Sequence, residues 1–256
     1  MRRLEKVHEK AFALRIAGDP RAAMAHFAIE VRGAHVYRNS DSRCHVVVPP
    51  DGVGDAHIIG AAELGELMPV LKDLPNSSRV IMSTHTHSRI AHALTPRSGR
   101  VIDIYAGPPG MGVKRVPPPR SDFDVRPVLY SDLALWKALP IDANHLVSGY
   151  RTQQEVLARG VAYGAFNGSR QVASLATVEL GRTFANIKVY TRPDLRGRGL
   201  ATHCVASILD HLQPTGERPL FVVDAVNGSP ERAMARHFDM EKMGELVVVA
   251  RKHMAF

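Results

Sequence analysis

The sequence contains very little cysteine, few aromatic residues and no long apolar run. Its 256 residues include two cysteines, Cys44 and Cys204, one tryptophan, and 6% aromatic residues. Two cysteines so far apart in sequence supply neither a disulfide framework nor a cysteine-rich zinc finger, so each is expected to be a small buried residue. No stretch approaches the ~20 consecutive apolar residues that a membrane-spanning helix needs.

The first residues also predict no export signal. Residues 1–6 (Met-Arg-Arg-Leu-Glu-Lys) turn charged again before an apolar signal region begins. We therefore expect a cytoplasmic protein with no membrane partner. A hydrophobic content of 45% and a charged content of 23% are typical of globular domains.

The formal net charge of +8 favours an anionic partner. Nucleic acid, an anionic membrane and a small anionic cofactor are the three classes that such a charge attracts. The basic residues are spread along the chain and form no compact run interleaved with aromatic residues. Nucleic acid is therefore disfavoured as a partner, although charge alone does not remove it.

Two short patterns suggest other chemistry and fail on closer comparison. His85 and His87 form an H-x-H pair, but Asp103 is the only acidic residue soon after them, and we predict no metal. Gly107 and Gly112 have the spacing of a phosphate-binding P-loop, yet Val113 stands where that loop needs lysine. These histidines are expected to be polar residues leaving a strand, and the glycines to belong to a linker.

The stretch 187–201 combines a strand, a turn and the start of a helix. A β-branched and aromatic run stops at Pro193, and apolar residues then recur with helical spacing from Leu200 to Leu212. A helix that begins at Gly197 or Gly199 has unpaired amide N–H groups at the positive end of its dipole. Such a helix end binds phosphate groups.

The residues of this turn are suited to a pyrophosphate. Two glycines let a ligand approach the backbone without a Cβ in the way. Arg196 and Arg198 add positive charge and forked donors that match phosphate oxygens. A dinucleotide site would need G-x-G-x-x-G and an acidic residue ~20 positions later, and neither is present.

These residues resemble the acyl-CoA motif of the GNAT superfamily of N-acetyltransferases. The six residues 196–201 match its pattern R/Q-x-x-G-x-G/A, and residues 189–201 match the longer form V-x-T-x-P-x-x-R-G-x-G-L-A. The segment 241–246 also resembles the stretch after the last helix of that family. The resemblance covers about 122–252 and implies a mixed α/β (α+β) fold with a GNAT-like mixed central sheet flanked by helices.

The hydrophobic pattern of the second half predicts the element order β-α-α-β-β-β-α-β-α-β. Its strands are expected at 123–130, 161–166, 171–179, 184–191, 219–226 and 245–251, and its helices at 131–139, 142–159, 198–213 and 230–238.

The first half carries no motif that can be placed. Its short strands and helices predict a small mixed α/β domain, for which a degenerate copy of the same fold is one possibility left open. The Pro/Gly-rich segment 107–121 offers little for a regular element, because proline lacks an N–H and fixes φ. We therefore predict an N-terminal domain over 1–106, a linker over 107–121 and an acetyltransferase-like domain over 122–256.

The resemblance implies an acyl-CoA site between the strand that ends at Thr191 and the apolar strand 220–226. The pyrophosphate would rest on the main-chain N–H groups of the turn, and the N–H of Thr191 would hold the pantetheine arm. The N–H of Val189 would polarise the thioester carbonyl. The predicted cofactor-binding residues are Val189, Thr191, Arg196, Gly197, Arg198, Gly199, Leu200, Ala201, Thr202 and Asn227.

The catalytic residues are less well defined by the sequence. Glu179 is the predicted general base for the attacking amine, although a solvated glutamate at a strand end would look the same. The family commonly protonates the leaving thiolate with a tyrosine on the last helix, and Ala235 stands near that place here. Tyr190 and His203 are the substitutes, so the predicted catalytic groups are Glu179, Tyr190 and the N–H of Val189.

The resemblance implies an N-acetyltransferase that moves an acetyl group from acetyl-CoA to an amine by direct attack in a ternary complex. The acceptor is expected to be a small-molecule or protein amine, and a homodimer is one assembly left open. A catalytically inactive or regulatory CoA-binding protein is the alternative, because the usual acid and glutamate positions are not filled. A basic nucleic-acid-associated module is the second alternative.

Overall fold

The computed structural model describes residues 1–50, 54–95, 98–113, 116, 122–168, 171–225 and 229–254. By its internal contacts the chain divides into two compact units. The first consists of Met1–Ile104, Val223–Ser229 and Lys242–Phe256, and the second of Tyr105–Val222 and Pro230–Glu241.

The first unit is built on a mixed sheet whose neighbouring strands run β1-β2-β3-β4-β5-β12. All of these strands pair antiparallel except β4 and β5, which are parallel. Its elements are β1 (Arg2–Arg3), α1 (Lys6–Ile16), η1 (Pro20–Ala22), α2 (Ala23–Arg32), β2 (His35–Arg38), β3 (Cys44–Val48), β4 (Asp55–Gly60), α3 (Leu64–Leu71), β5 (Arg79–Met82), α4 (Thr84–Ile90), η2 (Ala91–Ala93), β6 (Gly99–Ala106), β12 (Glu241–Ala250) and η6 (Arg251–His253).

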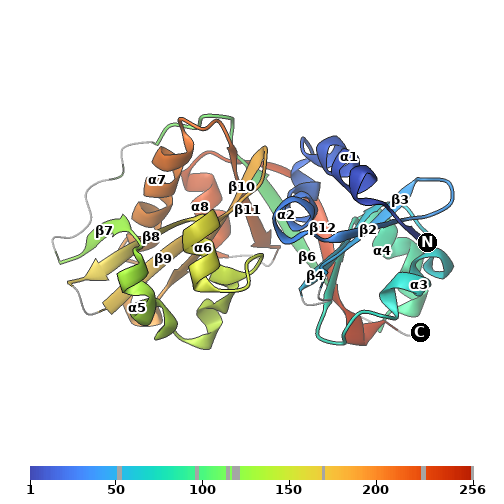
Figure 1. Cartoon of the computed structure of the whole chain (residues 1–256). Coiled ribbons are helices and arrows are strands. Elements are labelled where there is room, and N and C mark those ends of the chain that lie inside the picture. Colours follow the sequence, from blue (N-terminus) through green and yellow to red (C-terminus); the bar gives the residue numbers. More distant parts are fainter. Residues whose placement is uncertain are drawn as a thin grey trace. The chain divides into compact units, whose positions relative to one another are not determined.

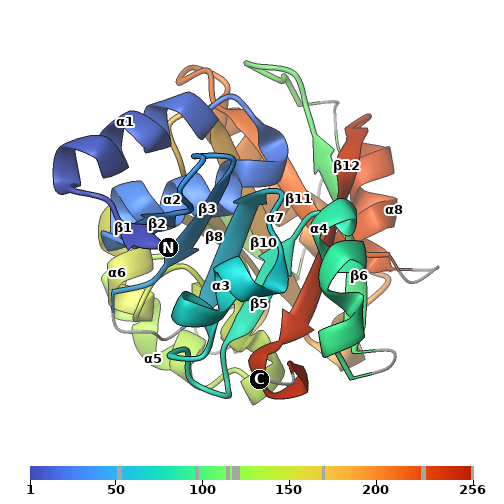
Figure 2. The ribbon, with the colours of Figure 1, turned by 90° about the vertical axis from the view of Figure 1, so that its right-hand side faces the viewer.

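Apolar side chains cover both faces of this sheet. On one face Val36 and Val47 pack with Phe12 and other residues of α1 and α2. On the opposite face Val46 packs with Leu67 and other residues of α3 and α4, in front of the sheet in Figure 2. Since successive residues of a strand point to opposite faces, the apolar run of β3 serves both cores.

The second unit contains the strand order β7-β8-β9-β10-β11. The pairs are antiparallel up to β10, and β10 and β11 are parallel. Helices α5 and α6 lie on one face of the sheet and α7 on the other (Figure 1). The elements are β7 (Asp124–Pro127), η3 (Tyr130–Asp132), α5 (Leu133–Lys137), η4 (Ile141–Val147), α6 (Gln153–Arg159), β8 (Val161–Asn167), β9 (Gln171–Leu180), β10 (Phe184–Thr191), η5 (Pro193–Leu195), α7 (Leu200–Leu212), β11 (Arg218–Asp224) and α8 (Pro230–His237).

The two halves of the chain repeat one order of elements. In each half a strand and helices lead to three strands, a helix, a strand, a helix and a last strand. The pairing repeats as well, because antiparallel neighbours are followed by one parallel pair, β4 with β5 and β10 with β11. The predicted mixed fold and the interpretation of the first half as a copy are therefore confirmed.

The last strand of the sequence belongs to the first unit. Strand β12 pairs antiparallel with β5, with Val247 opposite Met82 and Val249 opposite Val80. The contiguous domains predicted at 1–106 and 122–256 divide the chain differently, because no local pattern marks which sheet a strand joins. After β6, the Gly107 N–H donates to the Pro219 carbonyl at 2.9 Å, so the start of the predicted linker is tied to β11.

Two local expectations were wrong. The single helix expected over 142–159 is split into η4 and α6, because Gly149 has φ +94° and Thr152 caps α6 by accepting from the Glu155 N–H. His85 and His87 lie on helix α4 rather than at the end of a strand. Residues two apart on a helix do not share a face, so this H-x-H pair does not present two ligands together.

Two buried histidines are expected to make folding pH-dependent. Burial lowers the pKa of His45 and of His57 from 6.5 to about 4. The unfolded state therefore binds more protons between these values, and stability is full above pH 6.5 and falls as the pH drops toward 4. Each histidine should cost about 2 kcal/mol of unfolding free energy at about pH 5.

Urea unfolding of the chain at about pH 7.5 and about pH 5 measures this loss. The variants His45→Gln and His57→Gln should each flatten the pH dependence, whereas His8→Gln, at an exposed position of α1, should leave it unchanged. Equal unfolding free energies at the two pH values would contradict the prediction.

Candidate active site

The turn between β10 and α7 has the backbone that its glycines permit. Gly197 has φ +75° and Gly199, the N-cap residue of α7, has φ +78°. Side chains other than glycine rarely adopt these angles. The first main-chain bond into the helix is donated by the His203 N–H to the Gly199 carbonyl at 3.1 Å, so the preceding N–H groups lie before the first helical bond.

There is open space next to the two glycines of this turn. A Cβ added at Gly197 would meet no atom within 4 Å, and one added at Gly199 would meet only the ring of His203, at 4.0 Å. The glycines are therefore not required by packing against the protein. We call this helix end the cradle (residues 196–202), because the N-terminus of a helix is suited to bind phosphate groups.

The side chains of the cradle divide into exposed and anchoring ones. Arg196 and Arg198 are exposed, and the Arg196 Nε donates to the Thr191 carbonyl at 3.3 Å, which folds this arginine back along the turn. Leu200 is 1% exposed and fixes the helix to the core, while Ala201 and Thr202 are half-buried. Cationic side chains and open N–H groups thus meet at one helix end.

Strand β10 loses its parallel neighbour before it ends. The described pairing with β11 consists of Phe184 with Arg218, Ala185 with Pro219 and Asn186 with Leu220. On the other side, β9 accompanies β10 as far as Thr191. Among the described residues no strand pairs with the β11 side of β10 after Asn186, and we call residues 187–191 on that side the open edge.

The main-chain groups of Val189 and Thr191 point to this open edge. The Arg192 N–H donates to the Ala173 carbonyl of the β9 segment at 3.0 Å, and groups along a strand alternate between its two neighbours. The carbonyl of Val189 accepts instead from His145 and that of Thr191 from Arg196. Both N–H groups predicted to contact acyl-CoA therefore lie on the side where a ligand strand can add.

His145 was not predicted and lies at the open edge. It belongs to η4, and its Nε2 is 3.1 Å from the Val189 carbonyl oxygen. Its Nδ1 is 2.8 Å from the carbonyl oxygen of Asp142. The contact joins residues 44 positions apart, so no local spacing in the sequence marks it.

Tyr190, a predicted proton donor, is 5% exposed, and its hydroxyl lies beside the carboxyl group of Asp142. Burial first, and then the charge of Asp142, raise the pKa of this hydroxyl. The ring of His145 lies 6.4 Å from the tyrosine ring. The tyrosine therefore keeps its proton at neutral pH, and its assignment as the acid stays a prediction.

Glu179, the predicted base, is buried and bonded to two neighbouring side chains. Asn186 Nδ2 donates to its Oε2 at 2.7 Å, and Lys188 Nζ forms an ion pair with its Oε1. The side chains of Glu179 and Lys188 are 8% and 14% exposed. An incoming amine reaches this carboxylate only by displacing one of these donors, and the role of Glu179 as a base stays a prediction.

The remaining predicted residues have different surroundings. Burial lowers the pKa of His203, which borders the cradle. Ala235, at the place of the missing tyrosine, is completely buried. Asn227 lies outside the described residues, so its predicted contact with the cofactor stays a prediction.

The described part of the chain contains no group of three His, Cys, Asp or Glu side chains arranged to hold a metal ion. Within the same residues, no helix combines the length and the apolar character needed to cross a bilayer.

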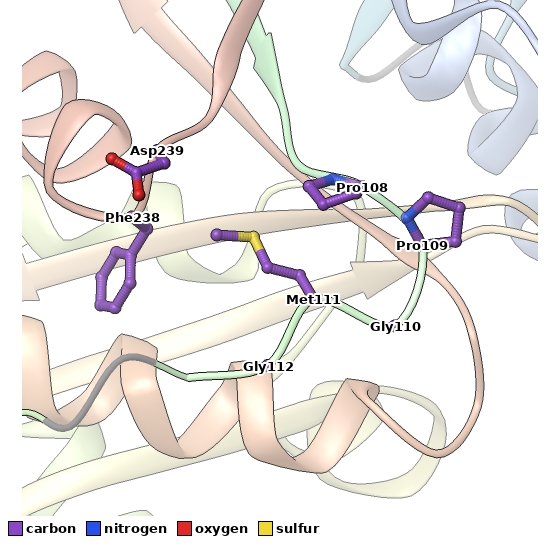
Figure 3. A pocket seen from close by; sticks show the side chains of 7 residues that line it. All are labelled: Pro108, Pro109, Gly110, Met111, Gly112, Phe238 and Asp239. Atoms are coloured by element: carbon purple, nitrogen blue, oxygen red, sulfur yellow. The ribbon is translucent and has the colours of Figure 1, made fainter.

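The second unit also contains a pocket of about 330 Å³. Pro108, Pro109, Met111 and Phe238 give it apolar walls, with Asp239 at its side (Figure 3). Gly112 lies near the side chain of Gln213, which follows the C-terminal end of α7. Because a helix of this length spans about 20 Å, the pocket and the cradle are at opposite ends of α7.

The corresponding turn of the first unit is built differently. The link 61–63 between β4 and α3 is much shorter than the link 192–199 between β10 and α7. The carboxylate of Glu66, in the first turn of α3, accepts from the Glu63 N–H at 3.0 Å. Two acidic side chains, one of them (Glu63) paired with Arg89, thus occupy the helix end where the second unit has glycines and arginines, and their carboxylates disfavour a phosphate there.

The arrangement of elements is that of the GNAT N-acetyltransferases. The chain is similar to a GCN5-related N-acetyltransferase-like protein from Streptococcus suis at 16% identity and a TM-score of 0.69, covering 96% of this chain and 99% of that chain. It is also similar to a GCN5-related N-acetyltransferase from Kribbella flavida, at 14% identity and a TM-score of 0.59, covering 93% of this chain and 94% of that chain.

A third similar structure is a tandem GNAT protein from the clavulanic acid biosynthesis pathway, at 14% identity and a TM-score of 0.55, with 98% of both chains covered. No protein-family model matches this sequence, and no curated protein matches it. At these identities the likeness concerns the fold. It confirms the fold that the resemblance of residues 189–201 implies, and it extends over both halves of the chain.

The buried pair of Glu179 and Lys188 should contribute to stability. Glu179→Gln leaves the lysine without its counter-charge and should lower the unfolding free energy by about 3 kcal/mol. In the double variant Glu179→Gln/Lys188→Met no unpaired charge remains, so most of the loss should be recovered. Urea unfolding measures both values.

A matched control for this prediction is Glu155→Gln, which removes the exposed pair of Glu155 with Arg159 on α6 and should change stability by less than about 1 kcal/mol. Glu179→Gln with unchanged stability and reduced turnover would instead assign the carboxylate to proton transfer.

Proposed function

We propose that this protein is an acyl-CoA-dependent N-acetyltransferase that transfers an acetyl group to an amine in a ternary complex. The observation that carries the proposal is the cradle beside the open edge of β10. A helix end with φ-positive glycines, open space and two arginines suits a pyrophosphate. An unpaired strand edge suits an extended, amide-containing arm such as pantetheine.

Acetyl transfer from a thioester requires three things of this chain. The N–H of Val189 donates to the thioester oxygen as negative charge develops on it, and the N–H of Thr191 fixes the pantetheine arm. The cradle holds the phosphates through the N–H groups of residues 197–201, with the Thr202 hydroxyl as a further donor. Most of the rate enhancement then comes from positioning the amine against a polarised carbonyl.

The direct test is to incubate the protein with acetyl-CoA and follow thiol release across a panel of amines. The panel should contain polyamines, aminoglycosides, amino acids and lysine-containing peptides. Amine-dependent thiol release supports the proposal. Binding of acetyl-CoA without turnover on any amine would support a regulatory CoA-binding protein, which the burial of Glu179 and the alanine at position 235 also favour.

The position of the pyrophosphate can be tested with charge at the helix start. Gly199→Glu places a carboxylate and a side chain in the open space of the cradle, so CoA binding should fall by at least about 100-fold. The matched control is Gly216→Glu, because Gly216 also has φ +78° and an open Cβ direction but follows the other end of α7. Calorimetric titration with CoA measures both affinities.

The control should bind CoA as the unaltered protein does, since the strain is equal in the two variants. Equal affinity of Gly199→Glu and the unaltered protein would show that the pyrophosphate does not bind at the cradle.

The acidic helix end of the first unit predicts one CoA per chain. The same titration should give a stoichiometry of one, and Gly199→Glu should remove all binding rather than half of it. A stoichiometry of two would show that the helix end at Glu63 and Glu66 accepts a phosphate group despite its carboxylates.

A further inference from the structure

The ring of His145 lies between two main-chain oxygens. Its Nδ1 is 2.8 Å from the carbonyl oxygen of Asp142 and its Nε2 is 3.1 Å from that of Val189. A carbonyl oxygen only accepts hydrogen bonds, and a neutral imidazole has a single N–H to donate. The doubly protonated ring is therefore the form that makes both bonds.

Side chains of the sheet hold this segment of η4 in place. Thr177 Oγ1 donates to the Leu146 carbonyl at 2.7 Å, and Lys188 Nζ donates to the Ser148 carbonyl. The hydroxyl of Ser148 in turn donates to the His145 carbonyl at 2.8 Å. Hydrogen bonds from side chains of β9 and β10 thus fix the position of His145, although its own side chain is exposed.

Asp142, Arg192 and Arg196 are charged groups near Tyr190, whose ring lies 6.4 Å from that of His145. Asp142 lies in the same helix as His145. On β10, the residue that faces the His145 ring is Tyr190, whose hydroxyl is neutral. Lys188 is neutralised by its ion pair with Glu179. When both of its nitrogens carry a proton, the ring of His145 places a cation against the carbonyl of Val189, whose N–H on the same edge is assigned to the thioester oxygen.

We propose that His145, as the imidazolium, donates the proton that the CoA thiolate takes up when it leaves. The amine nitrogen forms a bond to the acetyl carbon, the carbon–sulfur bond breaks, and its electron pair remains on sulfur. The proton of Nε2 leaves the Val189 carbonyl oxygen and passes to that sulfur, and the neutral ring regains a proton from solvent and its hydrogen bond to Val189. The proton lost by the amine goes to water. This inference rests on the proposed acyl transfer, and it names the residue that protonates the leaving thiolate in that reaction.

The test uses CoA itself and needs no acceptor amine. A cation beside the sulfur favours the thiolate, so the thiol of bound CoA should ionise about one pH unit lower in the unaltered protein than in His145→Gln. The glutamine amide can still donate to the Val189 carbonyl but carries no charge. The ultraviolet absorbance of the thiolate, followed against pH with CoA bound, measures the shift, which equals about tenfold in the ionisation constant.

Two further variants separate charge from proton donation and from general effects. His145→Arg keeps a cation that does not give up its proton at accessible pH, so it should retain the low thiol pKa yet lower kcat by about 100-fold with any amine that the panel identifies. His211→Gln alters an exposed histidine in the last turn of α7 and should change neither quantity.

The outcomes distinguish this inference from the proposed function. If the unaltered protein does not bind CoA, the proposed function fails. If CoA binds and its thiol ionises at the same pH in the unaltered protein and in His145→Gln, the assignment of His145 alone is overturned. Full activity of His145→Gln with an unchanged pH profile would overturn it as well, and would leave the histidine as a structural link between η4 and β10.

Discussion

The unpaired edge of β10 is the constraint on which the site depends. Main-chain donors and acceptors need partners when they are removed from water, and β11 stops pairing with β10 after Asn186. The carbonyls of Val189 and Thr191 are satisfied by side chains, one from His145 and one from Arg196. The N–H groups of the same two residues are directed to the open edge. The unpaired edge of the sheet thus presents two main-chain N–H donors next to the positive end of the α7 dipole.

The two halves show that this fold does not by itself make a site. Both contain a strand that pairs in parallel over three residues and a helix that follows it. In the first half a short link and two glutamates close the helix end, and in the second a longer link with two φ-positive glycines opens it. Binding chemistry therefore depends on the turn, and the shared scaffold supplies only its orientation.

The sequence predicted those features that are encoded by neighbouring residues. The strand, turn and helix over 187–201 were recognised because glycines, arginines and apolar spacing lie within one short segment, and most other elements followed from periodicity. Contacts between distant residues were missed. Lys188 meets Glu179 across two strands, and His145 meets Val189 across 44 positions. The helix expected over 142–159 is broken at Gly149, where an added Cβ would collide with the carboxylate of Glu179, which is a tertiary constraint.

The position of β12 has a consequence for synthesis of the chain. The strand of the first unit beside β5 is supplied by residues 247–250, of which Val247 and Val249 join its core. A ribosome that has made the first hundred residues has therefore not yet made this strand, and the edge of β5 lacks its partner until residue 250 has been made. Exposed strand edges pair readily with other chains. The order of synthesis thus makes the first unit the last to be completed, with its sheet edge open to intermolecular pairing meanwhile.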